Sequence, residues 1–213
     1  MTTKLATYNG ALRLLKERRL SSVTENREPR RLLDDAWGNE TTEGAVPACL
    51  EMGQWTFATR SVQIDYSPSV NPSFGYTYAF NQPTDMTTVC GIYSDPRMEV
   101  PLLDYRDERR FWYTDLQTIY VAYVSKDSGY GADLSLWPDS FRQLVEAYLA
   151  REIAGNLTNG DEKVKMATAA FEKALTFARS KDAMRKPPAF MPPSDWVTSR
   201  QGNLRSRWNG SWS

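Results

Sequence analysis

Histidine is absent from this sequence of 213 residues. Histidine is the usual general base near neutral pH and a frequent metal ligand, because its unperturbed pKa is about 6.5. Its absence excludes Ser-His and Cys-His catalysis and histidine-based zinc sites within this chain. We therefore expect a protein that is not an enzyme and that holds no cofactor and no metal.

Cysteine is also scarce. The two cysteines, Cys49 and Cys90, match no spacing typical of metal ligands. A buried thiol is the common state of an isolated cysteine. A disulfide between the two requires a fold that brings them together, so the sequence leaves both states open.

Neither sign of charge is in excess, and long apolar runs are missing. The chain has 26 Lys and Arg against 26 Asp and Glu, whereas proteins that wrap nucleic-acid phosphates carry a basic excess. This balance argues against a dedicated DNA-binding protein but allows a local basic patch. No stretch of about 18 apolar residues occurs, and the first ten residues contain no signal-peptide core. We expect synthesis in the cytoplasm and no membrane span.

The strongest pattern is a pair of consecutive helices predicted over residues 137–184. Pro138 and Asp139 suit the first turn of a helix. The apolar stripe of the first helix consists of Phe141, Leu144, Val145, Tyr148, Leu149 and Ile153. The residues predicted on its solvated side are Arg142, Gln143, Glu146 and Arg151. A break is predicted over residues 155–160, and a second stripe follows from Val164 to Ala178. This pair cannot bury its stripes alone, so other helices have to cover it.

Residues 1–54 provide those helices. The pattern predicts helices over residues 3–19, from Pro29 to Trp37 and over residues 45–54. Gly10 inside the first helix costs about 1 kcal/mol relative to alanine. Together with residues 137–184 they predict a helical bundle built from the N- and C-terminal parts of the chain.

Residues 55–136 change to a period of two residues, which is typical of half-buried strands. Strands are predicted around residues 55–66, 76–80, 87–93, 98–103, 110–113 and 118–124. Short turns between them favour one antiparallel β-meander inserted into the bundle, and residues 125–136 are expected to form an exposed loop back to it. The predicted fold class is α+β, with an extended C-terminal arm at residues 185–213.

The arm differs from the rest of the chain. Four prolines and two glycines prevent regular structure, and five basic residues against Asp195 alone give a net charge of +4. Trp and Arg dominate binding hot spots, so the arm is interpreted as a segment that orders against a partner. The alternative is a tail that folds back over its own domain. The candidate partner-binding residues are Arg185, Lys186, Trp196, Arg200, Arg205, Arg207, Trp208 and Trp212.

Other groupings point to structure rather than chemistry. Asp34 and Asp35 are expected on a solvated helix face, and Asp107 with Glu108 at a polar hairpin tip. The stretch 129–131 has two glycines but lacks the strand–helix context of a phosphate-binding loop. The Arg and aromatic residues at 110–113 could stack on bases, although a strand that packs against the bundle is the favoured interpretation.

Six short motifs carry a resemblance to a known family. They are Tyr8-Asn9-Gly10-Ala11-Leu12, Glu28-Pro29-Arg30-Arg31-Leu32-Leu33, Gly53-Gln54-Trp55-Thr56-Phe57-Ala58, Tyr78-Ala79-Phe80 before Gln82-Pro83-Thr84-Asp85, Ile119-Tyr120-Val121 and Trp137-Pro138-Asp139-Ser140-Phe141. In this order and spacing, over most of residues 5–184, they resemble the tail tubular protein A family, the head-to-tail adaptors (connectors) of short-tailed phages. No family motif matches residues 196–213.

The resemblance implies a structural virion protein at the head–tail junction. It implies a ring, typically a dodecamer, whose helical bundle docks on the portal protein and whose β-rich insertion faces the downstream nozzle protein and the tail fibres. The C-terminal segment would reach along portal subunits, and genome DNA would pass through the lumen without sequence-specific binding. Two alternatives stay open: a small nucleic-acid or protein binding module with a basic, Trp-rich tail, and a hydrolase with two converging carboxylates.

Overall fold

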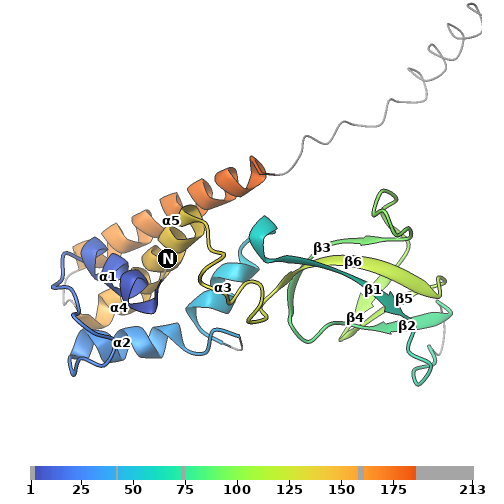
Figure 1. The fold of residues 1–213 in the computed structure, drawn as a ribbon, viewed down its shortest axis with the longest axis horizontal. Coiled ribbons are helices and arrows are strands. Elements are labelled where there is room, and N and C mark those ends of the chain that lie inside the picture. Colours follow the sequence, from blue (N-terminus) through green and yellow to red (C-terminus); the bar gives the residue numbers. More distant parts are fainter. Residues whose placement is uncertain (1–2, 42, 73–74, 158–160, 186–213) are drawn as a thin grey trace, which may run out of the picture.

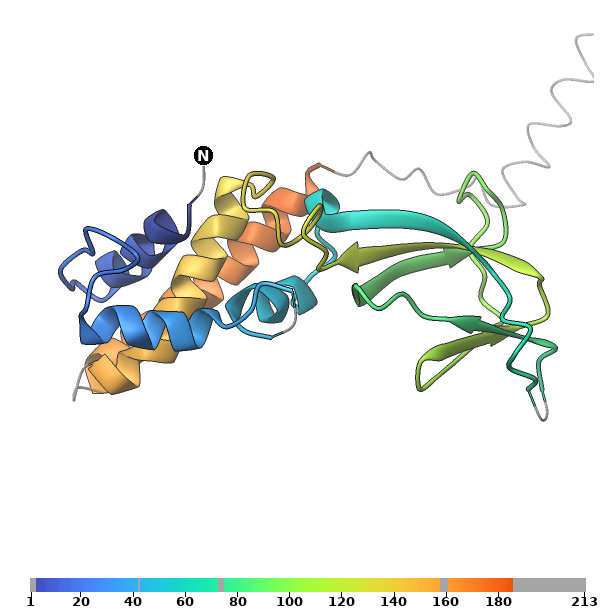
Figure 2. The same ribbon diagram turned by 60° about the horizontal axis from the view of Figure 1, so that its bottom comes forward.

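The computed structural model describes residues 3–41, 43–72, 75–157 and 161–185. The chain is an α+β protein, as predicted, with five helices and two small antiparallel sheets in the described residues. The helices lie at one end of an elongated molecule and the sheets at the other (Figure 1), and the two remain at opposite ends when the view is turned (Figure 2). We call them the helical part and the sheet part.

Helix α4 is the centre of the helical part. The helices are α1 (Lys4–Leu14), α2 (Glu28–Trp37), α3 (Ala45–Glu51), α4 (Asp139–Leu157) and α5 (Asp161–Ala183). α4 contacts each of the other four, because its predicted apolar stripe is buried. The large side chains that it buries are Phe141, Leu144, Val145, Leu149 and Ile153. The segments from the two halves of the chain therefore share one hydrophobic core.

Three helix boundaries differ from the sequence prediction, and one of them is the end of α3 at Glu51 rather than at residue 54. α1 ends at Leu14 rather than near residue 19, because Lys16 takes a left-handed conformation with φ 57°. The N–H of Lys16 then donates to the Arg13 carbonyl at 3.1 Å, and the N–H of Glu17 donates to the Leu12 carbonyl at 2.9 Å. This is the Schellman arrangement that terminates a helix. α4, in contrast, continues beyond the predicted break at Gly155.

The predicted single meander is wrong. β1 (Thr59–Asp65), β6 (Thr118–Ser125) and β3 (Met86–Tyr93) form one sheet in the order β1-β6-β3. β2 (Tyr78–Asn81), β5 (Phe111–Thr114) and β4 (Arg106–Glu108) form another in the order β2-β5-β4. All neighbours are antiparallel. β6 takes the centre of its sheet because it is apolar on both faces and is buried along nearly its whole length.

Two predicted strand segments also need correction, and one strand was not predicted. Trp55 and Phe57 do not begin a strand: the 3₁₀ helix η1 (Thr56–Ala58) turns their rings onto Phe141, with centroids 5.1 and 4.8 Å away. Residues 98–103 form no strand, because Met98 is left-handed at φ 58°. Residues 106–108 do form a strand that was not predicted, since all three side chains are exposed and show no alternation.

The sheet part has a hydrophobic core of its own. Phe80, Trp112 and Val121 are fully buried between the two sheets, whereas Val124 at the other end of β6 belongs to the helical core. β3 pairs Met86 with Ser125 and Tyr93 with Tyr120. β3 therefore runs away from the helices, and the loop that follows it, residues 94–105, lies at the far end of the molecule.

Candidate functional site

Most of the predicted arm lies outside the described residues. Arg185 is the last described residue; it is exposed, and its N–H donates to the Asp182 carbonyl at 2.9 Å just beyond α5. The predicted partner-binding residues outside the described part of the chain are Lys186, Trp196, Arg200, Arg205, Arg207, Trp208 and Trp212. The arm therefore starts at the helical part.

The first carboxylate pair is not simply a solvated face. Asp34 on α2 is half-buried and accepts a hydrogen bond from the Tyr8 hydroxyl on α1 at 2.7 Å. Its carboxylate also lies 3.6 Å from the Lys4 ammonium group. Burial, and then the hydrogen bond to Asp34, raise the pKa of Tyr8 well above its usual value. Asp34 thus fastens α1 to α2, a role that its sequence context did not indicate.

The second pair stabilises a hairpin, as its position suggested. Asp107 lies on β4 and accepts hydrogen bonds from the Trp112 indole at 3.2 Å and the Gln82 side chain at 2.8 Å. The turn after Glu108 contains Arg109, which is left-handed at φ 58°. The Asp107 carboxylate is occupied by structural partners, so this pair does not form an acid–base couple.

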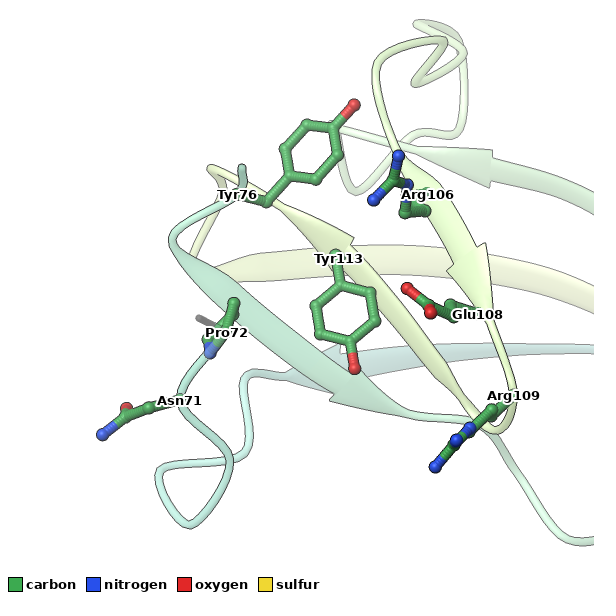
Figure 3. Close-up of a pocket in the computed structure, with 7 residues that line it drawn as sticks. All are labelled: Asn71, Pro72, Tyr76, Arg106, Glu108, Arg109 and Tyr113. Carbon is green, nitrogen blue, oxygen red and sulfur yellow. The ribbon is translucent and has the colours of Figure 1, made fainter. Parts of the chain in front are cut away.

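The exposed face of the β2-β5-β4 sheet carries a small polar pocket (Figure 3). It has a volume of about 220 Å³ and is lined by Asn71, Pro72, Tyr76, Arg106, Glu108, Arg109 and Tyr113. The Tyr76 hydroxyl donates to Asp104 at 2.7 Å, which fixes one wall. Arg106, Glu108 and Arg109 line one side of the pocket next to the Tyr113 ring (Figure 3), an arrangement suited to a polar loop of a partner.

An apolar groove runs between α1, α4 and α5. We call it the helical groove; its volume is about 440 Å³. Its lining residues are Arg13, Leu14, Gln143, Glu146, Ala147, Ala170, Lys173, Ala174 and Phe177. The lining includes three alanines, and the Phe177 side chain has 46% of its surface exposed. A second hollow continues along α5 past Thr176 to Ser180. Exposed apolar surface of this kind is typical of an interaction site.

A buried carboxylate lies beside the groove, where the sequence predicted a solvated side chain. The Glu146 side chain is 2% exposed and pairs with Arg142 at 2.8 Å and Arg13 at 3.5 Å. Burial raises its pKa, although the two guanidinium groups oppose that shift. Gly10 on α1 leaves the space that the carboxylate occupies. The mid-helix glycine was visible in the sequence, but nothing there linked it to Glu146.

The junction between the helical and sheet parts is organised by Asp85. Its carboxylate accepts hydrogen bonds from the Tyr123 hydroxyl at 3.1 Å, the Arg60 guanidinium at 3.1 Å and the Ser125 hydroxyl. Burial alone would raise the pKa of Asp85, but these hydrogen bonds outweigh it and the pKa is lowered. Asp85 therefore joins β1, β3 and β6 where they leave the helices.

The cysteines are thiols: Cys49 is buried, Cys90 is half-buried, and no disulfide joins them. Burial raises the pKa of Cys49 well above its usual value, so its thiol is protonated at neutral pH. Among the described residues, no group of three or more Cys, Asp and Glu side chains is placed to hold a metal ion. Likewise, none of the described helices is both long and apolar enough to cross a membrane.

In comparisons with known proteins, no family model matches this chain and no curated protein matches it significantly. Its function therefore has to be inferred from its own residues and surfaces.

Proposed function

We propose that this chain is a structural head-to-tail adaptor of a short-tailed phage. It would form a ring at the head–tail junction of the virion, join the portal protein to the tail and continue the DNA channel. The observation that carries the proposal is that each part of the molecule exposes apolar side chains, Phe177 and Met184 in the helical part and Val100 and Leu103 in the sheet part. The two parts themselves lie at opposite ends of the elongated molecule (Figures 1 and 2). A protein that bridges two partners needs separate docking surfaces of this kind.

The helical end is proposed to face the portal. Its exposed apolar side chains include Met184, directly after α5, which is 73% exposed. The basic, Trp-rich segment follows directly after α5, the last helix of the helical part. In the tail tubular protein A family, which the sequence motifs resemble, the helical bundle and the C-terminal segment dock on the portal.

The sheet end is proposed to face the tail, with the nozzle protein and the tail fibres as partners. The loop at residues 94–105 exposes Val100 by 56% and Leu103 by 86%. The Asp95 carboxylate holds this loop by accepting hydrogen bonds from the backbone N–H groups of Glu99 and Val100 at 3.1 and 2.7 Å. A loop that is ordered before binding loses less conformational entropy when a partner docks.

A zero net charge suits the proposed channel. Each phosphate that a protein neutralises strengthens its binding to DNA and makes that binding salt-dependent. A channel through which the genome slides benefits from weak, sequence-independent contact instead. The formal charge of this chain is zero over its whole length, which favours the passage of DNA through the channel over tight binding of the DNA to its wall.

Light scattering of the purified chain, alone and mixed with a portal ring of its phage, tests the proposal. We expect a complex whose mass increases by about one chain for each portal subunit, with no turnover of any substrate. If the chain does not bind the portal ring, the proposal is contradicted. If that chain instead bound DNA with a steep dependence on salt, the nucleic-acid binding module would replace the adaptor.

A further inference from the structure

We propose that the helical groove is the docking site of the chain's own residues 187–193, which would anchor the start of the C-terminal arm. This segment reads Pro187-Pro188-Ala189-Phe190-Met191-Pro192-Pro193. Phe190 and Met191 are the side chains that would enter the groove. The proposal does not depend on the adaptor function. With residues 187–193 in the groove, Met184 and residues 194–213 would remain available for the portal or for any other partner.

The groove is shaped for one or two apolar side chains. Its lining includes Ala147 on α4 and Ala170 and Ala174 on α5, whose small side chains leave room for an inserted group. Leu14 on α1 and Phe177 on α5 add apolar surface to the lining. A volume of about 440 Å³ accepts a phenyl ring together with a thioether chain. Such an insertion would cover the exposed face of Phe177.

The segment lies within reach of the groove. An α-helix rises about 1.5 Å per residue, so the Cα atom of Phe177 lies about 12 Å along the helix axis before that of Arg185. An extended proline-rich chain advances about 3.1 Å per residue, so Phe190 reaches about 16 Å beyond Arg185. A turn directly after α5 therefore places Phe190 and Met191 beside Ala174 and Phe177. The short tether also raises the effective concentration of the segment to the millimolar range.

The charge of the groove and the backbone of the segment favour residues 187–193 over later parts of the arm as the occupant of the groove. The rim of the groove carries Arg13 and Lys173, whereas the nearby Glu146 is buried and already paired. Residues 187–193 are uncharged, so the basic rim does not repel them; the part of the arm from Arg200 to Arg207 would be repelled. Flanking prolines hold an extended conformation with exposed carbonyl groups, which the two rim cations can bind.

Limited digestion of the full chain with chymotrypsin tests the anchor, because the enzyme cuts after aromatic residues. Cleavage after Trp208 in the same molecule is the internal reference for an accessible site. We expect the Phe190–Met191 bond of the wild-type chain to be cut at least about tenfold more slowly than the Trp208–Asn209 bond. The Phe177→Ser variant, which loses apolar surface of the groove lining, should remove most of this protection.

Met166→Ser is the matched control. Met166 lies on the same helix, is 39% exposed and is not among the groove residues, so its replacement should leave the protection unchanged. Both substituted residues are partly exposed and neither is a buried core residue, so both variants are expected to fold, which circular dichroism checks. Equal cleavage at Phe190 and Trp208 in the wild-type chain would overturn the proposal. Protection that rises with protein concentration would also overturn it, because the occupant would then be a second copy.

Discussion

At the scale of single residues, a glycine on α1 makes room for a buried carboxylate on α4. A Cβ atom at Gly10 would come within 3.0 Å of the carboxylate carbon and both oxygens of Glu146. The carboxylate cannot withdraw easily, since Arg142 and Arg13 hold it. Close packing of α1 on α4 therefore requires glycine at position 10, although glycine costs about 1 kcal/mol in helix propensity relative to alanine.

Gly10→Ala should destabilise the protein, although alanine is the better helix former. The overlap with Glu146 costs about 1–3 kcal/mol, as overpacking of a well-filled site does, and outweighs the gain in propensity. We expect a lower midpoint of urea unfolding. The combined variant Gly10→Ala/Glu146→Ala should recover much of the loss that Gly10→Ala causes, because the overlapping group is removed.

Gly155→Ala is the matched control for that experiment. Gly155 is also a helical glycine, on α4, but an added Cβ atom would meet nothing within 4 Å. This substitution should stabilise the protein by about 0.5–1 kcal/mol through helix propensity alone. If both glycine variants shifted the midpoint in the same direction, close packing of Glu146 on Gly10 would not be the cause.

Asp85 should make the stability of the sheet part depend on pH in the acid range. Its pKa is lowered in the folded protein, so its contribution to stability is present above the unfolded-state pKa of about 3.9 and is lost as the pH falls through the folded value. Asp85→Asn should be less stable than the wild type by about 1–2 kcal/mol at pH 7.

Urea unfolding of both proteins between pH 7 and pH 3 checks this prediction. The difference in free energy of unfolding between wild type and variant should shrink as the pH falls below about 4. Other titrating groups, Glu146 included, are common to both proteins and largely cancel in the difference. A difference that stayed constant over this range would show that the charge of Asp85 does not contribute.

At the scale of elements, the C-terminal end of α5 is fastened to the start of the sheet part. The Asp182 carboxylate accepts hydrogen bonds from the backbone N–H and the hydroxyl of Thr56, each at 3.0 Å. The Arg179 guanidinium donates to the Met52 carbonyl at 2.9 Å. A carboxylate near a helix C-terminus is unfavourable for the helix dipole, so these contacts across the fold have to compensate for its position.

Asp182→Ala should lower the free energy of unfolding by about 2 kcal/mol, because the backbone N–H and the hydroxyl of Thr56 lose their charged acceptor. Hydrogen exchange should also become faster in residues 178–183, since the last turn of α5 is no longer fastened. Ser180→Ala is the control: Ser180 is an exposed neighbour, and its replacement should change neither measurement. Unchanged exchange in Asp182→Ala would mean that packing alone holds the end of α5.

Element type was largely predictable from the sequence, whereas element pairing was not. The stripe of α4 and the β-prone residues of β6 are local patterns, and the structure contains both elements. The position of β6 between β1 and β3 depends on contacts between residues far apart in the chain, which periodicity does not encode. Strand β4 was not predicted because its three residues are all exposed and show no alternation of apolar and polar side chains. It is a strand because it pairs with β5.

The candidate site shows the same limit. Arg185 was correctly placed just past a helix, yet the helical groove combines side chains of α1, α4 and α5 and was not predicted. Asp34 and Glu146 looked like solvated residues because their own helices are polar at those positions. Their partners, Tyr8 and Arg13, come from another helix. Interactions across elements therefore set the surfaces that matter for binding.

At the scale of the whole molecule, the described fold has two separate hydrophobic cores, one in the helical part and one between the sheets. Within the part of the chain that the structure describes, the last buried residue of either core is Ala178. We therefore predict that a chain truncated after Arg185 still folds and shows a cooperative unfolding transition in urea. Loss of folding on truncation would show that residues 186–213 belong to the core.

The same truncation should abolish binding to the portal ring, because the predicted contact residues after Arg185 are removed. A full-length variant with Trp196, Trp208 and Trp212 replaced by alanine keeps the arm but removes these side chains. It therefore tests whether the tryptophans themselves bind the portal. If the tryptophans are the hot spots, replacing all three should weaken portal binding at least about a hundredfold, since each buried Trp typically contributes 2 kcal/mol or more. Co-sedimentation with the portal measures both variants. A truncated chain that still bound the portal as tightly as the full chain would place the contact on the helical part itself, and the arm would then have another role.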